Sequence, residues 1–492
     1  MHPSRTSPAT RRRPLRALAV AATAAALAVG LPAVAAQAEE APGQTHVGEV
    51  VRVWTDAGPH GDAAAEAAAG APVTLVENAA GASVPVPGAA AADLPLGATV
   101  EVPVGEETAG AADQPPAPEL PDADVLRTAP SGGAPLTNQV TVARVLLPGA
   151  TDDGTSVAAL VEAVDTEVAP FWAGETDGAI RLGVTATATD WVQATVDCSD
   201  PTLLWNQVGA AVHFEDGPGR HLLLYVVGAP GTDCAYAMGE VGAGPGAGGR
   251  VYVRDALPSV IAHELGHNFG LGHSSGSQCD GAVEGGNCRT APYRDYYDVM
   301  GASWRQVGAL NAPQAAALGV LPPSAQVALP ADGATTTLAL APLSGRTGTR
   351  AVRLADTTGG TYWLELRAAA GRDSWLGTAD NRFRLQTGVL LHRTGAMPDT
   401  SVLLDGSPAA AGAWDRDLQA ALPAGVPVVL AGGDLVVTVA EVTGAGATVT
   451  VTTTAPAAPV PPQPQAAGAP RVLAGAAGRA AAAGSPGAGD AP

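Results

Sequence analysis

Three histidines and a glutamate occupy one eleven-residue stretch, HELGHNFGLGH, which begins at His263. In a helix, His263 and His267 are four residues apart, so their side chains share one face with Cβ atoms about 5–6 Å apart. Glu264 points around the helix axis, where it can reach a water molecule more easily than it can act as a ligand. His273 is out of phase with that face, so we expect Gly270 to end the helix in a left-handed conformation. Three neutral imidazoles with one open position are typical of a catalytic zinc site.

The spacing of these three histidines favours a role as metal ligands more strongly than an isolated histidine would. A lone histidine is usually a surface or hydrogen-bonded residue and has only about a one in ten chance of being a metal ligand. With all five positions fixed, a chance match falls to about one in a million per starting position if residue frequencies are equal. The pattern therefore favours a metal site.

The same five positions match the signature H-E-x-x-H-x-x-G-x-x-H of the metzincin metallopeptidases. Those enzymes place a methionine on a tight turn beneath the zinc ligands, and YYDVMGASW supplies Met300. With the following LNAPQAAALGVL, the chain most resembles the gametolysin-type peptidases and their bacterial relatives, although Ser274 after the third histidine resembles matrixins. Some metzincins carry a metal-approaching tyrosine two residues after the methionine. Ala302 stands there, so no tyrosine ligand is expected.

The resemblance implies an α/β (α+β) catalytic domain with a zinc helix and a Met-turn, and one catalytic Zn²⁺. We therefore expect a secreted zinc-dependent endopeptidase in which His263, His267 and His273 hold the metal and Glu264 is the general base that activates water. Its partner would be a protein or peptide substrate. The alternative is a noncatalytic adhesion or matrix-binding protein with a structural zinc, whose fourth position would be closed by another protein ligand. Calcium binding and oligomeric state are not indicated.

The N-terminus has the order of a secretory signal peptide. RRRPLR is followed by the apolar ALAVAATAAALAVGL and the small-residue AVAAQA, which predicts cleavage after Ala38 and a signal peptide over residues 1–38. The apolar run of about fifteen residues is shorter than the roughly twenty of a membrane-spanning helix. Arg11 to Arg13 leave a twin-arginine export route open. No integral membrane segment is expected in the mature, extracellular chain.

Charge and cysteine content agree with export. The net charge of −21 argues against a nucleic-acid partner, because phosphate binding requires a basic surface. An even number of cysteines in an exported chain suggests disulfides. Of the three possible pairings, we favour Cys279 with Cys288 and Cys198 with Cys234.

Composition shifts predict the domain organisation. After the signal peptide we expect a β-rich N-terminal region, a flexible linker, a metzincin-like catalytic domain, a β-sandwich and a disordered Ala/Pro/Gly tail; the ranges are 39–104, 105–135, 136–321, 322–454 and 455–492. These boundaries predict that the catalytic domain binds zinc without the sandwich.

The N-terminal region is interpreted as a pro-region, which predicts a zymogen. It contains no cysteine, so a thiolate cannot keep the enzyme latent. An aspartate such as Asp122 or Asp124 is a possible replacement, and Arg127 is a possible processing site.

Two further stretches bear on binding. CAYAMGEVG resembles the edge strand against which such peptidases hold substrate, although a surface loop is an equal alternative. The repeated short strands after residue 322, such as TYWLELRA and ATVTVTT, predict an antiparallel β-sandwich. Within it, Trp363 and Leu385 are expected in the core, and His392 has no nearby ligand partners in the sequence.

Overall fold

The computed structural model describes residues 45–56, 72–79, 81–86, 91, 94–103, 135–232, 234–303, 306–345, 347–409 and 417–456. All of these described residues belong to one compact unit. The predicted signal peptide, most of the predicted linker and nearly all of the predicted tail lie outside the described residues. Among the residues described, no helix is long and apolar enough to cross a membrane.

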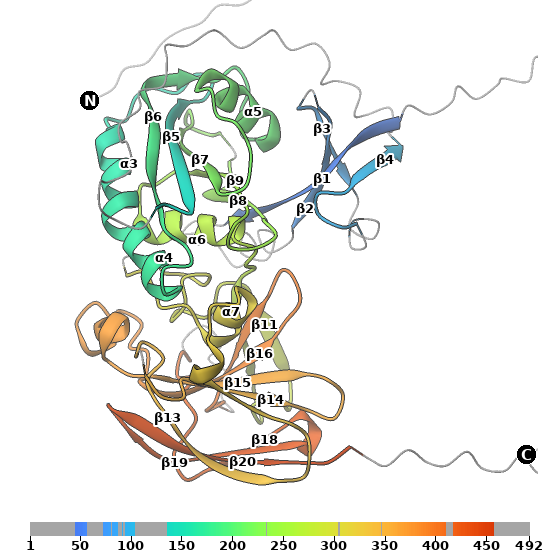
Figure 1. The fold of residues 1–492 in the computed structure, drawn as a ribbon, viewed down its shortest axis with the longest axis vertical. Helices are drawn as coiled ribbons and strands as arrows, with labels where there is room; N and C mark the ends of the chain where they lie inside the picture. The colour runs from blue at the N-terminus through green and yellow to red at the C-terminus, as the bar shows by residue number, and fades with distance from the viewer. Residues whose placement is uncertain are drawn as a thin grey trace, which may run out of the picture. The chain divides into compact units, whose positions relative to one another are not determined.

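The first nine strands of the described chain form one sheet (Figure 1). Four of its strands are parallel neighbours in the order β9-β7-β5-β6, namely β9 (Gly249–Val253), β7 (Arg220–Val227), β5 (Asn138–Leu146) and β6 (Leu182–Gln193). Strand β8 (Ala237–Glu240) pairs antiparallel with β9. The CAYAMGEVG stretch therefore does contain a strand.

Helices cover both faces of this sheet because alternate strand residues are apolar on both sides. On one face, Val140 and Val142 of β5 pack with the helical run that comprises α3 (Val157–Ala163), the π-helical turn η2 (Val164–Val168) and α4 (Ala169–Glu175). On the other face, Ala143 and Val145 pack with α5 (Pro201–Ala211). The result is the mixed α/β arrangement expected from the sequence.

The N-terminal region adds four strands to the same sheet. These are β1 (Thr45–Asp56), β2 (Val73–Glu77), β3 (Ser83–Val86) and β4 (Thr99–Pro103). Strand β1 pairs with β2 and β4, and its last four residues pair antiparallel with β8. The edge of β8 that does not pair with β9 is thus covered by the chain's own N-terminal region.

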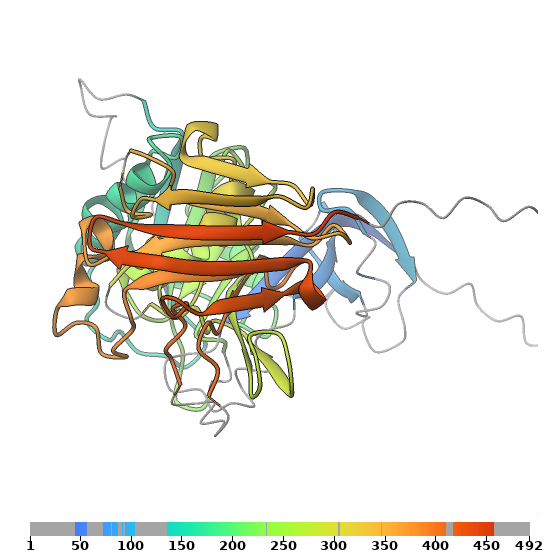
Figure 2. The same ribbon diagram turned by 90° about the horizontal axis from the view of Figure 1, so that it is seen from below.

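The remaining strands form two more sheets. The seven-stranded sheet has the order β11-β10-β17-β16-β15-β14-β12, and the four-stranded sheet has the order β13-β20-β19-β18. Their bounds are β10 (Ser274–Cys279), β11 (Cys288–Ala291), β12 (Gln326–Leu329), β13 (Thr335–Leu340), β14 (Ala351–Ala355), β15 (Thr361–Arg367), β16 (Gly388–Thr394), β17 (Ser401–Leu404), β18 (Pro427–Leu430), β19 (Leu435–Thr443) and β20 (Gly446–Thr453). Apolar side chains of the two sheets meet in one core, and Figure 2 shows the strands of the smaller sheet lying across the larger one.

The larger sheet differs from the antiparallel sandwich that the sequence predicts. Strands β12 and β14 pair in parallel, and so do β10 and β17. Strands β10 and β11 come from the predicted catalytic domain, whereas β17, which pairs with β10, lies after residue 322. Backbone hydrogen bonds therefore cross the predicted boundary between the catalytic domain and the sandwich.

Short helices join these layers. Helix α7 (Ala312–Ala317) is capped by Asn311, and short 3-10 helices occur at Pro323–Ala325, Gly371–Gly377 and Ala431–Gly433. Trp363 and Leu385 are both buried, as expected. His392 is buried as well, but its Nε2 lies 3.0 Å from Asp295 Oδ2, a partner that the sequence did not suggest.

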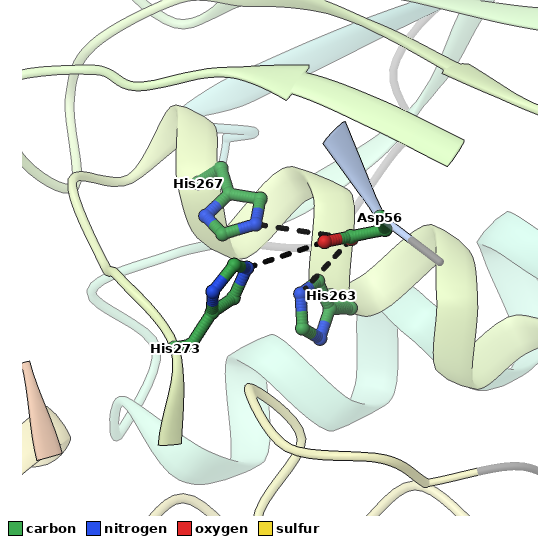
Figure 3. Close-up of side chains that lie close together, drawn as sticks. All are labelled: Asp56, His263, His267 and His273. Carbon is green, nitrogen blue, oxygen red and sulfur yellow. Dashed lines mark ion pairs between the residues drawn. The ribbon is translucent and has the colours of Figure 1, made fainter. Parts of the chain in front are cut away.

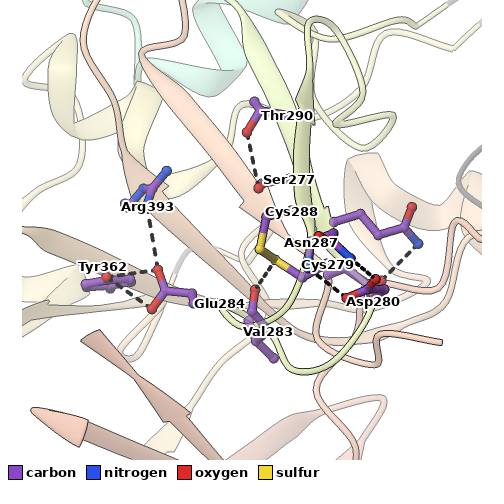
Figure 4. The surroundings of a disulfide bond; sticks show 12 residues. Ser277, Cys279, Asp280, Val283, Glu284, Asn287, Cys288, Thr290, Tyr362 and Arg393 are labelled. Atoms are coloured by element: carbon purple, nitrogen blue, oxygen red, sulfur yellow. Dashed lines mark hydrogen bonds and ion pairs between the residues drawn. A yellow bond between two sulfur atoms is a disulfide. The ribbon is translucent and has the colours of Figure 1, made fainter. Parts of the chain in front are cut away.

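Both favoured disulfide pairings are present, Cys198 with Cys234 and Cys279 with Cys288. The second joins directly opposed residues of β10 and β11, next to a turn in which Asp280 accepts hydrogen bonds from Asn287 (Figure 4). Glu284 in the same turn accepts a hydrogen bond from Tyr362. The disulfide therefore closes a hairpin that is also attached to the C-terminal strands.

Candidate metal centre

Helix α6 (Pro258–Asn268) carries the first two histidines. It begins with Pro258 in its first turn, and His263 and His267 project from the same side (Figure 3). Gly270 has a φ of +91°, so it makes the left-handed exit that the sequence predicts. A Cβ at that position would lie 2.9 Å from the carbonyl oxygen of Gly242, which also requires glycine. The turned chain brings His273 beside the helix.

The imidazoles are held with their Nε2 atoms toward one point. Nδ1 of His263 lies 2.8 Å from the carbonyl oxygen of Val299, and Nδ1 of His267 lies 2.8 Å from that of Leu271. A carbonyl can only accept, so each Nδ1 carries the proton and each Nε2 presents a lone pair. His273 is positioned through its backbone, whose N–H donates to the carbonyl of Pro398 at 2.7 Å.

The fourth member of the cluster is Asp56, at the end of β1. Its Oδ2 lies 3.2 Å from His263 Nε2 and 3.9 Å from His267 Nε2, and its Oδ1 lies 3.2 Å from His273 Nε2. One ligand atom from each of the four residues lies within 4.8 Å of the others, and all four residues are buried. Asp122 and Asp124, the aspartates suggested by the sequence, lie outside the described residues.

These residues fit a zinc ion. Ligand atoms about 2.0–2.1 Å from a tetrahedral zinc are roughly 3.3 Å apart, close to the two shorter separations here. The three buried Nε2 atoms make no hydrogen bond of acceptable geometry among the described residues. Buried polar atoms normally have a partner, and a cation between the histidines and the carboxylate would supply one. Three histidines and one aspartate could thus hold a metal ion.

Burial in the cluster favours the neutral form of two of the three histidines, His267 and His273. Burial, followed by the positive charges of His263 and His273, lowers the pKa of His267 to about 3. Burial also lowers the pKa of His273. Burial opposes ionisation of Asp56, but the charge of His263 and hydrogen bonds from its neighbours hold the pKa of Asp56 well below its usual value. Asp56 is therefore an anion, which is the charge state a carboxylate ligand needs. Burial opposes a proton on His263, but the charge of Asp56 raises the pKa of His263, so a metal would have to displace that proton.

Glu264 lies beside this cluster rather than in it. Burial, and then the negative charge of Asp56, raises the pKa of Glu264 well above its usual value. Neither carboxyl oxygen of Glu264 has a fixed donor among the described residues, so a proton shared with Asp56 is its available partner. A cation on the histidines would favour the ionised form of Glu264, which is the form a base requires.

Met300 lies against helix α6. It is fully buried, and a Cβ at Gly266 of α6 would collide with its sulfur atom. The turn is tight, since the N–H of Met300 donates to Asp298 Oδ1 at 2.7 Å and the N–H of Gly301 donates to the Asp298 carbonyl at 3.0 Å. The Met300 carbonyl accepts from the N–H of Ser274, so the turn is attached to the residue after the third histidine.

Tyr293 is a site residue that the sequence reasoning missed. Its hydroxyl donates to Asp56 Oδ1 at 2.5 Å, and its ring centroid is 4.1 Å from that of His273. Its carbonyl accepts from the N–H of Ala302, the position at which no tyrosine ligand was expected. The only local signal for Tyr293 is its place in the tyrosine-rich PYRDYYDVM. Asp56 has no signal beyond its place after the apolar EVVRVWT.

Comparison with known proteins adds no family assignment. No family model matches the chain, and the search of curated proteins returned no match. The evidence for function therefore rests on the geometry of the centre.

Proposed function

We propose that this protein is a secreted zinc-dependent endopeptidase of the metzincin type, synthesised in a latent form. The observation that carries the proposal is the convergence of three histidine Nε2 atoms beside a buried glutamate, whose carboxyl oxygens have no fixed donor among the described residues. A structural metal site gains nothing from Glu264. Burying a carboxyl group next to another carboxylate is costly, and its retention favours a role in chemistry.

Bound zinc would supply Lewis-acid polarisation of the peptide carbonyl and would make water a stronger acid. Glu264, which lies beside the ligands, takes a proton from the attacking water. As the carbon–nitrogen bond breaks, Glu264 returns that proton to the leaving nitrogen. The backbone carbonyls of Val299 and Leu271 accept hydrogen bonds from Nδ1 of His263 and His267 and keep both rings oriented during these steps.

Strand β8 is the proposed substrate-binding edge. It is the outermost strand of the catalytic sheet once β1 is set aside, and its backbone groups can bind an extended peptide as a further antiparallel strand. Gly239 of β8 packs directly on α6, because a Cβ there would lie 2.9 Å from the Glu264 carbonyl oxygen. A peptide added to β8 would therefore run alongside the base and the histidines.

In the latent form, β1 takes the place of substrate. It pairs with β8 as a peptide would, but it directs the side chains of Trp54 and Asp56 into the centre. The ring of Trp54 stacks on that of His267 at 6.0 Å. The scissile bond of a substrate is thus replaced by a side-chain carboxylate that water cannot cleave.

The same Asp56 gives the alternative its best support, because a fourth protein ligand is typical of a structural zinc. The two readings differ in whether β1 is removable. In the peptidase reading, cleavage within residues 105–134 releases the N-terminal strands and opens the fourth position. In the structural reading, Asp56 must stay for the fold to persist.

The test uses the full chain before and after limited trypsin cleavage, with trypsin then inhibited. We expect the cleaved protein to hydrolyse an unstructured protein such as casein, a chelator to abolish this, and zinc to restore it. Glu264→Ala should keep its zinc and lose at least about a hundredfold in rate. A cleaved, zinc-loaded parent that leaves casein intact, or a Glu264→Ala variant as fast as the parent, would contradict the proposal.

A further inference from the structure

Tyr293 is held at the centre by features that packing does not require. It adopts a φ of +60°, a conformation that non-glycine residues rarely take. Among the described residues, the partners that its hydroxyl is shown to contact are Asp56 Oδ1 and the carbonyl oxygen of Thr55, at 2.5 and 3.3 Å. Both partners belong to β1, the strand that we propose is displaced on activation. In the open enzyme, the hydroxyl would therefore face the space that Asp56 had filled.

The Asp56 carboxylate indicates what enters that space. It is a planar group with two oxygens, of which Oδ2 faces His263 and Oδ1 faces His273 and the Tyr293 hydroxyl. Glu264, the proposed base, is buried near enough to this carboxylate for the charge of Asp56 to raise the pKa of Glu264, after the effect of burial. A peptide carbonyl attacked by water likewise has two oxygens on one carbon, one from water and one from the carbonyl. Asp56 thus resembles the reacting group, with a base and a donor already in place.

On the basis of the proposed function, we propose that Tyr293 is a catalytic residue that donates a hydrogen bond to the carbonyl oxygen of the scissile peptide. As the water oxygen bonds to the carbonyl carbon, the π electrons move to the carbonyl oxygen, and the Tyr293 O–H binds the charge that develops there. Tyr293 keeps its proton throughout, while Glu264 carries the proton from water to the leaving nitrogen. A fixed donor aimed at developing charge stabilises the transition state more than the ground state.

The donor is positioned from two sides. The Tyr293 ring packs against His273, and its carbonyl is held by Ala302 just beyond the Met300 turn. The hydroxyl is therefore fixed relative to the third histidine and needs no rearrangement during reaction. This fixed geometry predicts an effect on turnover rather than on substrate affinity.

The experiment compares Tyr293→Phe with the parent, both activated by cleavage within residues 105–134. We expect kcat to fall by about 10²–10³-fold with KM nearly unchanged, and zinc content and melting temperature to match the parent. A phosphinic peptide, whose tetrahedral phosphorus bears two oxygens, should bind more weakly by a comparable factor. A noncleavable peptide with a reduced amide bond, which lacks the carbonyl oxygen, should bind both proteins equally.

Tyr296→Phe is the matched control, because this tyrosine lies in the same loop with its ring stacked on Phe383 at 4.5 Å. It should leave kcat and phosphinate affinity unchanged. If Tyr293→Phe keeps the parental kcat and phosphinate affinity, the role of Tyr293 is refuted while the peptidase proposal stands. If the activated parent itself cleaves nothing, both proposals fall together.

Discussion

At the scale of single residues, the chemistry near the centre depends on buried groups whose ionisation is tied to folding. His221 of β7 is an example outside the metal cluster. It is fully buried, with Nδ1 3.0 Å from Asn268 Oδ1 and Nε2 2.9 Å from Asn138 Oδ1. Burial lowers the pKa of His221 to about 4. Asn268 is the last residue of α6, so His221 connects β7 to the end of this helix.

This shift predicts a loss of stability in mild acid. Between pH 6.5 and pH 4 the unfolded chain binds a proton at His221 and the folded chain does not, so the free energy of unfolding falls as pH falls. A shift of this size corresponds to roughly 3 kcal/mol across the whole interval. Urea unfolding of metal-free protein at several pH values should show this slope. His221→Gln should be less stable than the parent at pH 7. On acidification, its free energy of unfolding should fall less steeply than that of the parent, because the contribution of one titrating group is absent. Equal pH slopes for the two proteins would show that His221 does not titrate on unfolding.

At the scale of secondary structure, the decisive contact is that of β1 with β8. It is reinforced by Arg250 of β9, which is buried and forms ion pairs with Glu77 of β2 at 2.8 Å and with Glu240 of β8 at 2.5 Å. Release of the N-terminal strands would remove Glu77 but leave Arg250 paired with Glu240. The ion pair between β9 and β8 therefore does not depend on the N-terminal strands.

Asp56→Ala in the uncleaved chain tests whether the side chain on β1 closes the centre. We expect the uncleaved parent to be inactive. The variant should hydrolyse a short peptide at least about tenfold faster and bind zinc more weakly, because a charged ligand has been lost. Glu49→Ala is the control, since Glu49 is exposed on the same strand. The rate of peptide hydrolysis and the zinc affinity are measured for the three proteins. If Asp56→Ala is as inactive as the parent, the pairing of β1 with β8 is sufficient for latency.

At the scale of the whole molecule, the centre depends on strands far along the chain. The residues after His273 pair with β17, and Gly272 donates its N–H to the hydroxyl of Thr400 at 3.0 Å. Arg367 of β15 is completely buried and donates to the Ala309 carbonyl at 3.1 Å and to Glu365 at 2.7 Å. The predicted division at residue 321 would cut through these contacts.

We therefore expect a chain that ends at residue 321 to lack a cooperative unfolding transition and to bind zinc poorly, contrary to the expectation from the sequence. A chain that ends at residue 456 keeps all described strands and should unfold like the full protein. Arg367→Met should cost about 3–5 kcal/mol, because it leaves buried carboxylates without their partner. Thermal unfolding and zinc binding of the three proteins provide the check. If a chain ending at residue 321 unfolds cooperatively and binds zinc with full affinity, the prediction of an independent domain over residues 136–321 would hold instead.

Local spacing along the chain was sufficient to predict several features of the centre and the fold. The helical period placed His263 and His267 on one face, and the steric freedom of glycine located the turn at Gly270. Alternating apolar residues located many of the strands, and the nine-residue separation of Cys279 and Cys288 suited a closed hairpin.

The distant residues that complete the centre could not be predicted in this way, because they meet only in the folded protein. Tyr293 and Asp56 are 237 positions apart, and neither belongs to a recognisable local motif. They meet because β1 pairs with β8, and strand pairing is set by hydrogen bonds and side-chain packing that a single strand's sequence does not specify. The pairing of β10 with β17 was not predicted for the same reason. Backbone hydrogen bonds are the same for nearly all residue types, so the sequence does not show which strands pair across the predicted boundary.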